Sequence, residues 1–147
     1  MSNPITLPVG KIVATFGPNW EPIVALVRRA ATLTPDETKQ LDAAGAVARS
    51  VARSAARAVT GSAARSAARS VAGHAARDKA GHAARSATRS AVGSAAWYAA
   101  GDAAGDAAWA LVVADLVGEH GFTQDHFDTL TAPWFQVCGD PRAEVTA

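Results

Sequence analysis

The chain has little cysteine, few aromatic residues and no long hydrophobic run. Cys138 is its only cysteine, which excludes an internal disulfide and fits a reducing compartment, so we expect a cytoplasmic protein. The longest apolar stretch, Ala107 to Val117, contains Asp115 and is far shorter than the roughly 20 residues that a membrane span needs. Residues 1–16 lack the charged and apolar regions of a secretory signal. We therefore expect no membrane segment.

Large apolar side chains are also scarce, with one Met, one Tyr, four Phe and four Trp among 147 residues. The hydrophobic content is 49%, but much of it is alanine, which removes little apolar surface from water at about 25 cal/mol per Å². Stability must then come from close contact between helices and from the aromatic residues outside the repeat. Self-association would add to this core, so we expect a homo-oligomer.

The length predicts a single domain, residues 1–147, with three consecutive parts. Residues 1–33 should form a short extended arm, from Ile5 to Phe16, and a first helix capped by Asn19 that ends near Leu33. Residues 34–118 should form the alanine-rich helices, and residues 119–147 a short helix and a tail.

Two further helix starts are marked by threonine. Thr34, Pro35 and Glu37 supply a cap, a first-turn proline and the closing residue of a capping box. Near the carboxyl end, Thr123 can cap a short helix that Pro133 should stop. Its Phe127 and Leu130 should face inward, and Trp134, Phe135 and Val137 should then fold back on the bundle.

The dominant feature is an uninterrupted four-residue repeat from Ala43 to Ala114, which contains 18 tetrads such as VARS, AARS, VAGH and AAGD. The first two positions are almost always Ala, Val, Thr or Leu, and the third is mostly Arg or Gly. Alanine and arginine are strong helix formers, so the repeat favours helix despite a cost of about 1 kcal/mol for each interior glycine. The expected fold is an all-α compact helical bundle.

A period of four determines how such helices pack. Four residues turn an α-helix through about 400°, so the stripe of small residues moves some 40° around the helix with each tetrad. An ordinary left-handed coiled coil needs a period of 3.5 and is excluded. The pattern matches the i±4 ridge, which predicts crossings near −50° with alanine and glycine at closest approach.

The repeat is too long for one globular helix, because residues 36–117 would extend about 120 Å. We expect breaks where glycine is followed or preceded by capping residues. The three expected sites are Thr60-Gly61-Ser62, Lys79-Ala80-Gly81 and Val92-Gly93-Ser94.

Charge is divided along the chain. Residues 43–96 carry eight Arg and one Lys against Asp78 alone, a balance of 9 − 1 = +8. Residues 97–147 carry Arg142 against eight acids, a balance of 1 − 8 = −7. The two blocks either face each other, within one subunit or between copies, or the basic block meets an external anion such as nucleic acid.

The segment AAWYAAGDAAGDAAWALVVADLVGEHGFTQDHFDTLTAPW resembles the carboxyl-terminal part of alanine-rich tetrad-repeat proteins of actinobacteria and their phages. The resemblance covers about two thirds of the chain, and GEHGFTQDHFDTLTAPW is its specific part. Most such proteins have no assigned function. Some similar repeats are labelled immunity proteins, which implies a small cytoplasmic protein that binds and neutralises a partner.

Few side chains suggest a metal-binding or catalytic site. His74, Asp78 and His82 recur at intervals of four, a spacing that metal ligands can use, but a fourth ligand is lacking and a solvated polar position is the better interpretation. Asp102 and Asp106 can form a carboxylate pair, although the fourth tetrad position is routinely polar and a structural role is favoured. No cofactor or metal is expected.

Two histidines flank the turn before Thr123. His120 and His126, with Asp125 and Asp128 nearby, can be read as an acid–base pair, or as capping and surface hydrogen bonds, which explain them at least as well.

The most distinctive candidate is a column of arginines at the third tetrad position, which we call the Arg column. Like charges four residues apart repel, so something anionic should face them. Either phosphates or the carboxylates of Asp102, Asp106, Asp115 and Glu119 can do so. We expect the carboxylates, because the two charge blocks nearly cancel. The predicted partner-binding or anion-binding residues are Arg49, Arg53, Arg57, Arg65, Arg69, Arg77, Arg85 and Arg89.

These features together predict a non-enzymatic helical interaction protein of actinobacterial or phage origin, immunity-like in kind, which binds a protein partner or itself. The alternative is a nucleic-acid-binding protein that uses the Arg column. An enzyme is the third class, and the sequence offers it no convergent catalytic site.

Overall fold

The first helix follows Asn19, as the sequence predicts, but this residue does not cap it. The computed structural model describes residues 19–47, 50–66, 79–88 and 97–146, and in it α2 spans Trp20–Ala30. The Asn19 amide instead donates to the backbone oxygen of Val112 (3.2 Å) and to Oδ1 of Asp115 (2.8 Å). The predicted cap is therefore wrong, and Asn19 ties the start of α2 to the end of the repeat. The extended arm predicted for residues 5–16 lies outside the described residues.

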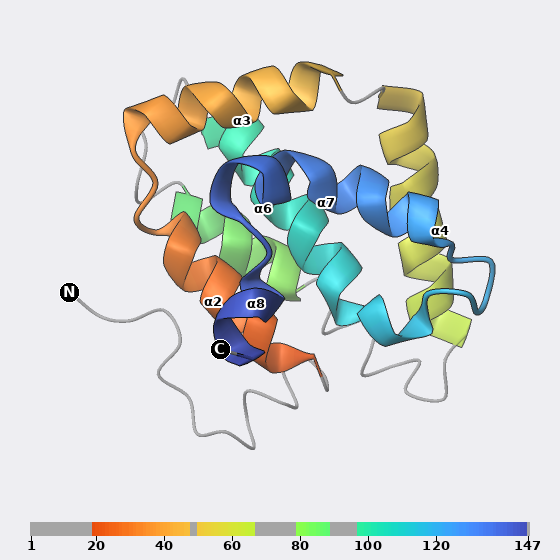
Figure 1. The fold of residues 1–147 in the computed structure, drawn as a ribbon. Helices are drawn as coiled ribbons and strands as arrows, with labels where there is room; N and C mark the ends of the chain where they lie inside the picture. The colour runs from red at the N-terminus through yellow and green to blue at the C-terminus, as the bar shows by residue number, and fades with distance from the viewer. Residues whose placement is uncertain (1–18, 48–49, 67–78, 89–96, 147) are drawn as a thin grey trace.

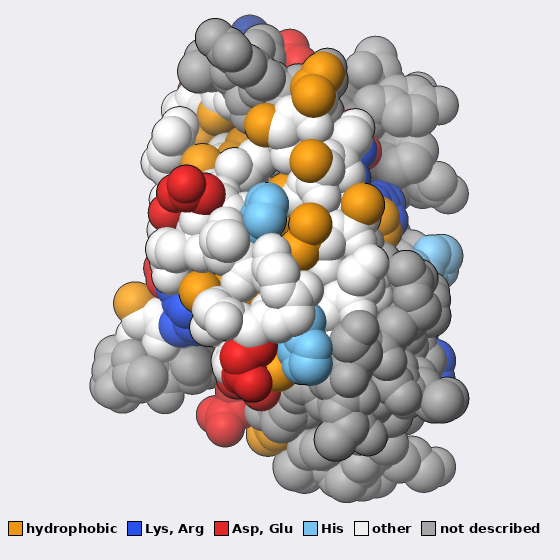
Figure 2. Space-filling model, turned by 90° about the vertical axis from the view of Figure 1, so that its right-hand side faces the viewer, with side chains coloured by type: hydrophobic (Ala, Val, Ile, Leu, Met, Phe, Trp, Pro, Cys, Tyr) orange, Lys and Arg blue, Asp and Glu red, His pale blue; other side chains and the backbone are white. Residues whose placement is uncertain are grey.

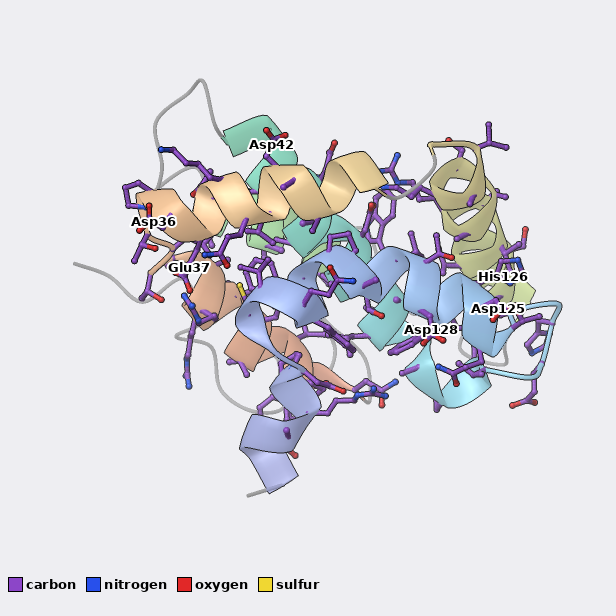
Figure 3. The ribbon with its side chains drawn as sticks, turned by 45° about the horizontal axis from the view of Figure 1, so that its top comes forward. Asp36, Glu37, Asp42, Asp125, His126 and Asp128 are labelled. Carbon is purple, nitrogen blue, oxygen red and sulfur yellow. The ribbon has the colours of Figure 1, made fainter. Side chains whose placement is uncertain are left out.

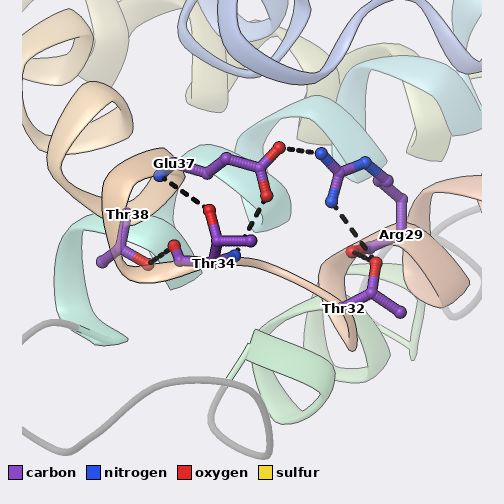
Figure 4. Close-up of polar contacts among 5 residues, drawn as sticks. All are labelled: Arg29, Thr32, Thr34, Glu37 and Thr38. Carbon is purple, nitrogen blue, oxygen red and sulfur yellow. Dashed lines mark hydrogen bonds and ion pairs between the residues drawn. The ribbon is translucent and has the colours of Figure 1, made fainter.

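The capping box before α3, which spans Pro35–Val47, is confirmed. The Glu37 amide donates to Oγ1 of Thr34 (3.2 Å), and the Thr34 amide donates to Oε1 of Glu37 (3.0 Å). The second carboxylate oxygen of Glu37 pairs with the Arg29 guanidinium of α2 (Figure 4). One glutamate thus completes the cap of α3 and joins it to the preceding helix.

Two of the three predicted breaks in the repeat are wrong. Helix α4 spans Ser50–Ser66 and continues through Gly61, and residues 79–88 are helical through Gly81. Both glycines are buried, so close packing at these positions offsets their poor helix propensity of about 1 kcal/mol. The third predicted break, residues 92–94, lies outside the described residues.

The end of the repeat leads into the carboxyl-terminal helices. Helix α6 spans Trp97–Val112 and is followed by η1, a single turn of 3₁₀-helix at Ala114–Leu116. Helix α7 spans Gln124–Cys138, and α8 spans Pro141–Thr146.

Pro133 does not stop α7, so the short helix predicted there is wrong. Thr123 caps α7 as predicted, and Phe127 and Leu130 are buried as predicted. Pro133 lies inside α7 and is buried beside Trp134, which is 1% exposed. A proline removes one backbone hydrogen bond from a helix, and here the burial of the surrounding side chains compensates for it.

Helix α6 runs through the centre of the molecule (Figure 1). It packs against α2, α3, α4 and α7, and every residue from 100 to 112 is buried except Asp102 and Trp109. A helix that is buried nearly all round is typical of a bundle centre. Alanine and glycine fill this helix, while Ile23 and Leu26 of α2 and Trp134 of α7 supply large side chains around it. The predicted all-α compact bundle is confirmed.

In the described part of the chain, no helix combines the length and the apolar character needed to cross a membrane.

Candidate functional site

Two members of the Arg column face inward. Arg53 and Arg57 lie one tetrad apart on α4 and reach the carboxylate of Asp106 on α6. Arg57 binds it through two bonds, Nε to Oδ1 at 2.8 Å and Nη2 to Oδ2 at 2.9 Å, and Nη2 of Arg53 donates to Oδ2 at 3.1 Å. One carboxylate therefore joins two arginines of the basic block to the acidic block.

Asp106 is 2% exposed, so this carboxylate is buried and needs its two partners. The hydrogen bond from Arg57 to Asp106 raises the pKa of Arg57, burial opposes this, and the charges of Asp106 and Asp102 add to the increase. Asp102, one tetrad earlier, is exposed. The two aspartates therefore lie in different environments, and Asp106 has the structural role that the sequence favours.

Of the four carboxylates expected to face the Arg column, Asp106 does so for Arg53 and Arg57, which confirms the pairing for these two arginines. Asp115 accepts a hydrogen bond from Asn19. Glu119 is exposed in the turn before α7. The side chains of the other predicted arginines, apart from Arg85, lie outside the described part of the chain: Arg49, Arg65, Arg69, Arg77 and Arg89.

Arg85 has a different environment, formed by Trp109 and by two glycines, Gly81 and Gly105. Its guanidinium carbon lies 4.7 Å from the centre of the Trp109 ring, a cation–π distance. A Cβ built on Gly105 would lie 2.8 Å from the same guanidinium, and one built on Gly81 would overlap the indole of Trp109. The two glycines thus make room for Arg85 and Trp109. The signal available in the sequence was the placement of both glycines and of Trp109 at the third tetrad position.

With Arg53 and Arg57 turned inward, the outward face of α4 carries no described charge. Val51, Ala55, Ala58 and Ser62 stand at i, i+4, i+7 and i+11 and are exposed, Val51 to 81%. Ala52 and Ser54 widen the same face, which we call the α4 face. Figure 2 shows hydrophobic side chains in a line on this side of the molecule, with carboxylates and histidines beside them.

Helix α7, which packs against α4, carries exposed carboxylates in its first turns. Figure 3 places Asp125, His126 and Asp128 together at the start of α7, at the opposite end of the molecule from Asp36. His126 closes the capping box with Thr123, so the capping interpretation of this histidine is confirmed. His120 lies in the preceding turn with a φ of 54°.

The described residues contain no cluster of His, Cys, Asp or Glu that could hold a metal ion. His82 is exposed, while His74 and Asp78 lie outside the described residues. Cys138 is half-buried, and burial raises the pKa of its thiol while the Arg29 charge opposes this. A thiol of raised pKa is a poor nucleophile at neutral pH.

No protein-family model, no curated protein and no solved structure matches the chain.

Proposed function

We propose that the protein works by binding protein, and that the partner at the α4 face is a second copy of the chain. The observation that carries the proposal is the inward turn of Arg53 and Arg57 onto Asp106. It turns these two charges inward, so that the described outward side chains of α4 form a stripe of small uncharged residues with the exposed Val51 at one end. The resemblance to alanine-rich repeat proteins, some of them labelled immunity proteins, also favours a binding role.

The shape of the stripe favours another helix as the occupant. Val51 and Ala55, and likewise Ala58 and Ser62, are four residues apart and form short i±4 rows of side chains no larger than valine. Two helices with such rows can pack into each other with their axes close together. Each copy of the chain presents the same rows on α4. A second copy therefore supplies a matching surface without any change in conformation.

The charge pattern favours a symmetric contact. In a two-fold interface, residues near the axis face their own copies, so a charge there would face a like charge. The exposed stripe of Val51, Ala55, Ala58 and Ser62 carries none, whereas exposed charges lie on α3 at Lys39 and on other helices. A neutral face of this kind can meet its own copy without repulsion.

Light scattering after size exclusion, over a concentration series, tests the proposal with Ala58→Arg and Ala58→Glu variants. Ala58 is exposed and central in the stripe, and both new residues keep good helix propensity. We expect the wild type to dimerise with rising concentration, each variant alone to be monomeric, and an equimolar mixture of the two to regain the dimer. Gln40→Arg, an exposed change on α3, is the matched control and should leave the dimer intact.

A wild type that stays monomeric at every concentration overturns the second copy as the partner. A dimer that persists in both Ala58 variants overturns the α4 face as its location.

A further inference from the structure

Helix α7 begins with a capping box whose closing residue is a histidine. The Glu or Gln that usually closes such a box is replaced by His126. The His126 amide donates to Oγ1 of Thr123 at 3.3 Å, and the Thr123 amide donates to Nδ1 of His126 at 3.0 Å. The hydroxyl of Thr123 is also 3.0 Å from Nδ1. The imidazole thus takes the acceptor role of a carboxylate or amide oxygen.

This acceptor role requires a neutral imidazole. Nδ1 must keep its lone pair to accept from the Thr123 amide, so the ring proton lies on Nε2. A protonated imidazole carries hydrogen on both nitrogens and can only donate. Its Nδ1–H could still donate to the Thr123 hydroxyl, but the Thr123 amide would lose its acceptor. The positive charge would also lie at the amino end of a helix, where the helix dipole disfavours a cation.

The cap joins α7 to the turn before it. Gly118, His120 and Gly121 all have positive φ angles in this turn, and the buried Phe122 at its end stacks on the His126 ring at 6.4 Å between centroids. Phe127, directly after His126, is buried in the core. Loss of the cap would therefore loosen the chain between two buried phenylalanines.

Other titratable groups near His126 lie at exposed positions. On α7, Asp125 and Asp128 are exposed, and Asp128 accepts a hydrogen bond from Gln124. In the turn, Glu119 and His120 are exposed.

On the neighbouring helices α4 and α6, the described charges are the Arg53 and Arg57 side chains, bound to Asp106, and the exposed Asp102. Helix α3, which also packs against α7, carries Asp36, Glu37, Lys39 and Asp42. Solvent and salt screen the exposed carboxylates, whereas the loss of the Nδ1 acceptor is local and is not screened.

We infer that the start of α7 is a protonation-sensitive latch, in which neutral His126 closes the turn of residues 118–122 onto the helix and protonated His126 releases it. The sign follows from the geometry: the folded state holds the neutral form, so the cap is intact at pH 8. It is lost when acidification protonates the ring.

Two NMR measurements on monomeric protein test this inference independently of the proposed self-association. Nitrogen-15 shifts at pH 7.5 should show His126 protonated on Nε2. Amide exchange of Thr123 and His126, corrected for intrinsic rates, should then show about fivefold more opening at pH 5.5 than at pH 7.5.

Matched variants separate the latch from other titrating groups. His126→Gln keeps an uncharged acceptor in the box and should show no such pH dependence. His126→Ala should open equally at both pH values. His120→Gln, a change to the other histidine of the region, should retain the wild-type response. A proton on Nδ1 at pH 7.5, or an unchanged pH dependence in His126→Gln, would overturn the inference, and neither result requires the alanine variant to fold.

Discussion

At the scale of single residues, Asp106 is a buried carboxylate that joins two arginines of α4 to α6. Its position follows from the repeat, because it occupies the fourth place of an AAGD tetrad on the central helix. Its burial does not follow from the repeat, since Asp102 has the same place one tetrad earlier and is exposed. The rotation of some 40° per tetrad explains the difference, because it turns successive members of one column towards different neighbours.

Asp106→Asn should destabilise the protein by about 2–3 kcal/mol, because it leaves Arg53 and Arg57 partly buried without their counter-charge. Urea unfolding followed by circular dichroism measures the free energy of unfolding. The control is Asp102→Asn, an exposed change on the same helix, which should cost less than about 0.5 kcal/mol. Equal losses in the two variants would contradict this account.

Asp140 gives a second residue-scale prediction. Burial alone raises the pKa of its carboxyl, but hydrogen bonds from the Arg142 side chain and amide, with the Arg142 charge, lower it below its usual value. A lowered pKa in the folded state means that the carboxylate stabilises the protein at neutral pH, and that this contribution is lost as the pH falls through the folded pKa.

Arg142→Gln should therefore raise the pKa of Asp140, because burial still acts and the side-chain bonds are removed. A carboxyl titration by NMR measures the change. Arg28→Gln, an exposed change on α2, should leave the Asp140 titration as it was.

At the scale of elements, helix contacts in this protein depend on which glycine meets which side chain. Gly81 lies in the helical residues 79–88 and faces Trp109 of α6. Gly105 lies in α6 and faces Arg85 of residues 79–88. A Cβ on Gly81 would lie 2.8 and 3.0 Å from two carbons of the rigid Trp109 indole, whereas a Cβ on Gly105 would meet the flexible end of Arg85.

Gly81→Ala should destabilise the protein by about 1–2 kcal/mol, because the overlap with Trp109 outweighs the gain in helix propensity. Gly105→Ala should stay within about 0.5 kcal/mol of the wild type, because Arg85 can move and the propensity gain offsets the lost cation–π contact. Thermal unfolding of the two variants measures both changes in stability. A larger loss of stability in Gly105→Ala than in Gly81→Ala would refute the packing account.

The elements could be predicted where a local signal controls them. The capping boxes at Thr34 and Thr123 set the starts of α3 and α7, since each depends on residues within one turn. Breaks at Gly61 and Gly81 and a stop at Pro133 were predicted from local propensity, which tertiary packing overrides.

The candidate site was predictable in part for the same reason. Charge complementarity pointed to Asp106 among the possible partners of the Arg column, but it could not choose between Asp106 and Asp102. That choice depends on how the helices are rotated against one another, which is a property of the whole packing.

At the scale of the whole molecule, the nearly cancelling charge blocks argue against a dedicated nucleic-acid binder. A DNA and RNA mobility-shift assay at low salt should show no tight binding, because two arginines of the basic block are already held by Asp106. An Arg65→Ala, Arg69→Ala double variant should behave as the wild type does. Tight, salt-sensitive binding that this variant loses would instead favour phosphate recognition by the Arg column.

The contact of Gly81 with Trp109 also bears on how a monotonous sequence selects one structure. Helices built from nearly identical tetrads can slide past each other by four residues, about 6 Å, and bury almost the same alanine surface after the slip. Such shifted registers are competing states of similar energy, which a folding landscape must separate. The indole of Trp109 lies over Gly81, where the opposing helix has no side chain, and a slip of one tetrad either way would place it over a position that carries an arginine. Gly81 thus marks the correct alignment, a role that its conformational freedom alone does not explain.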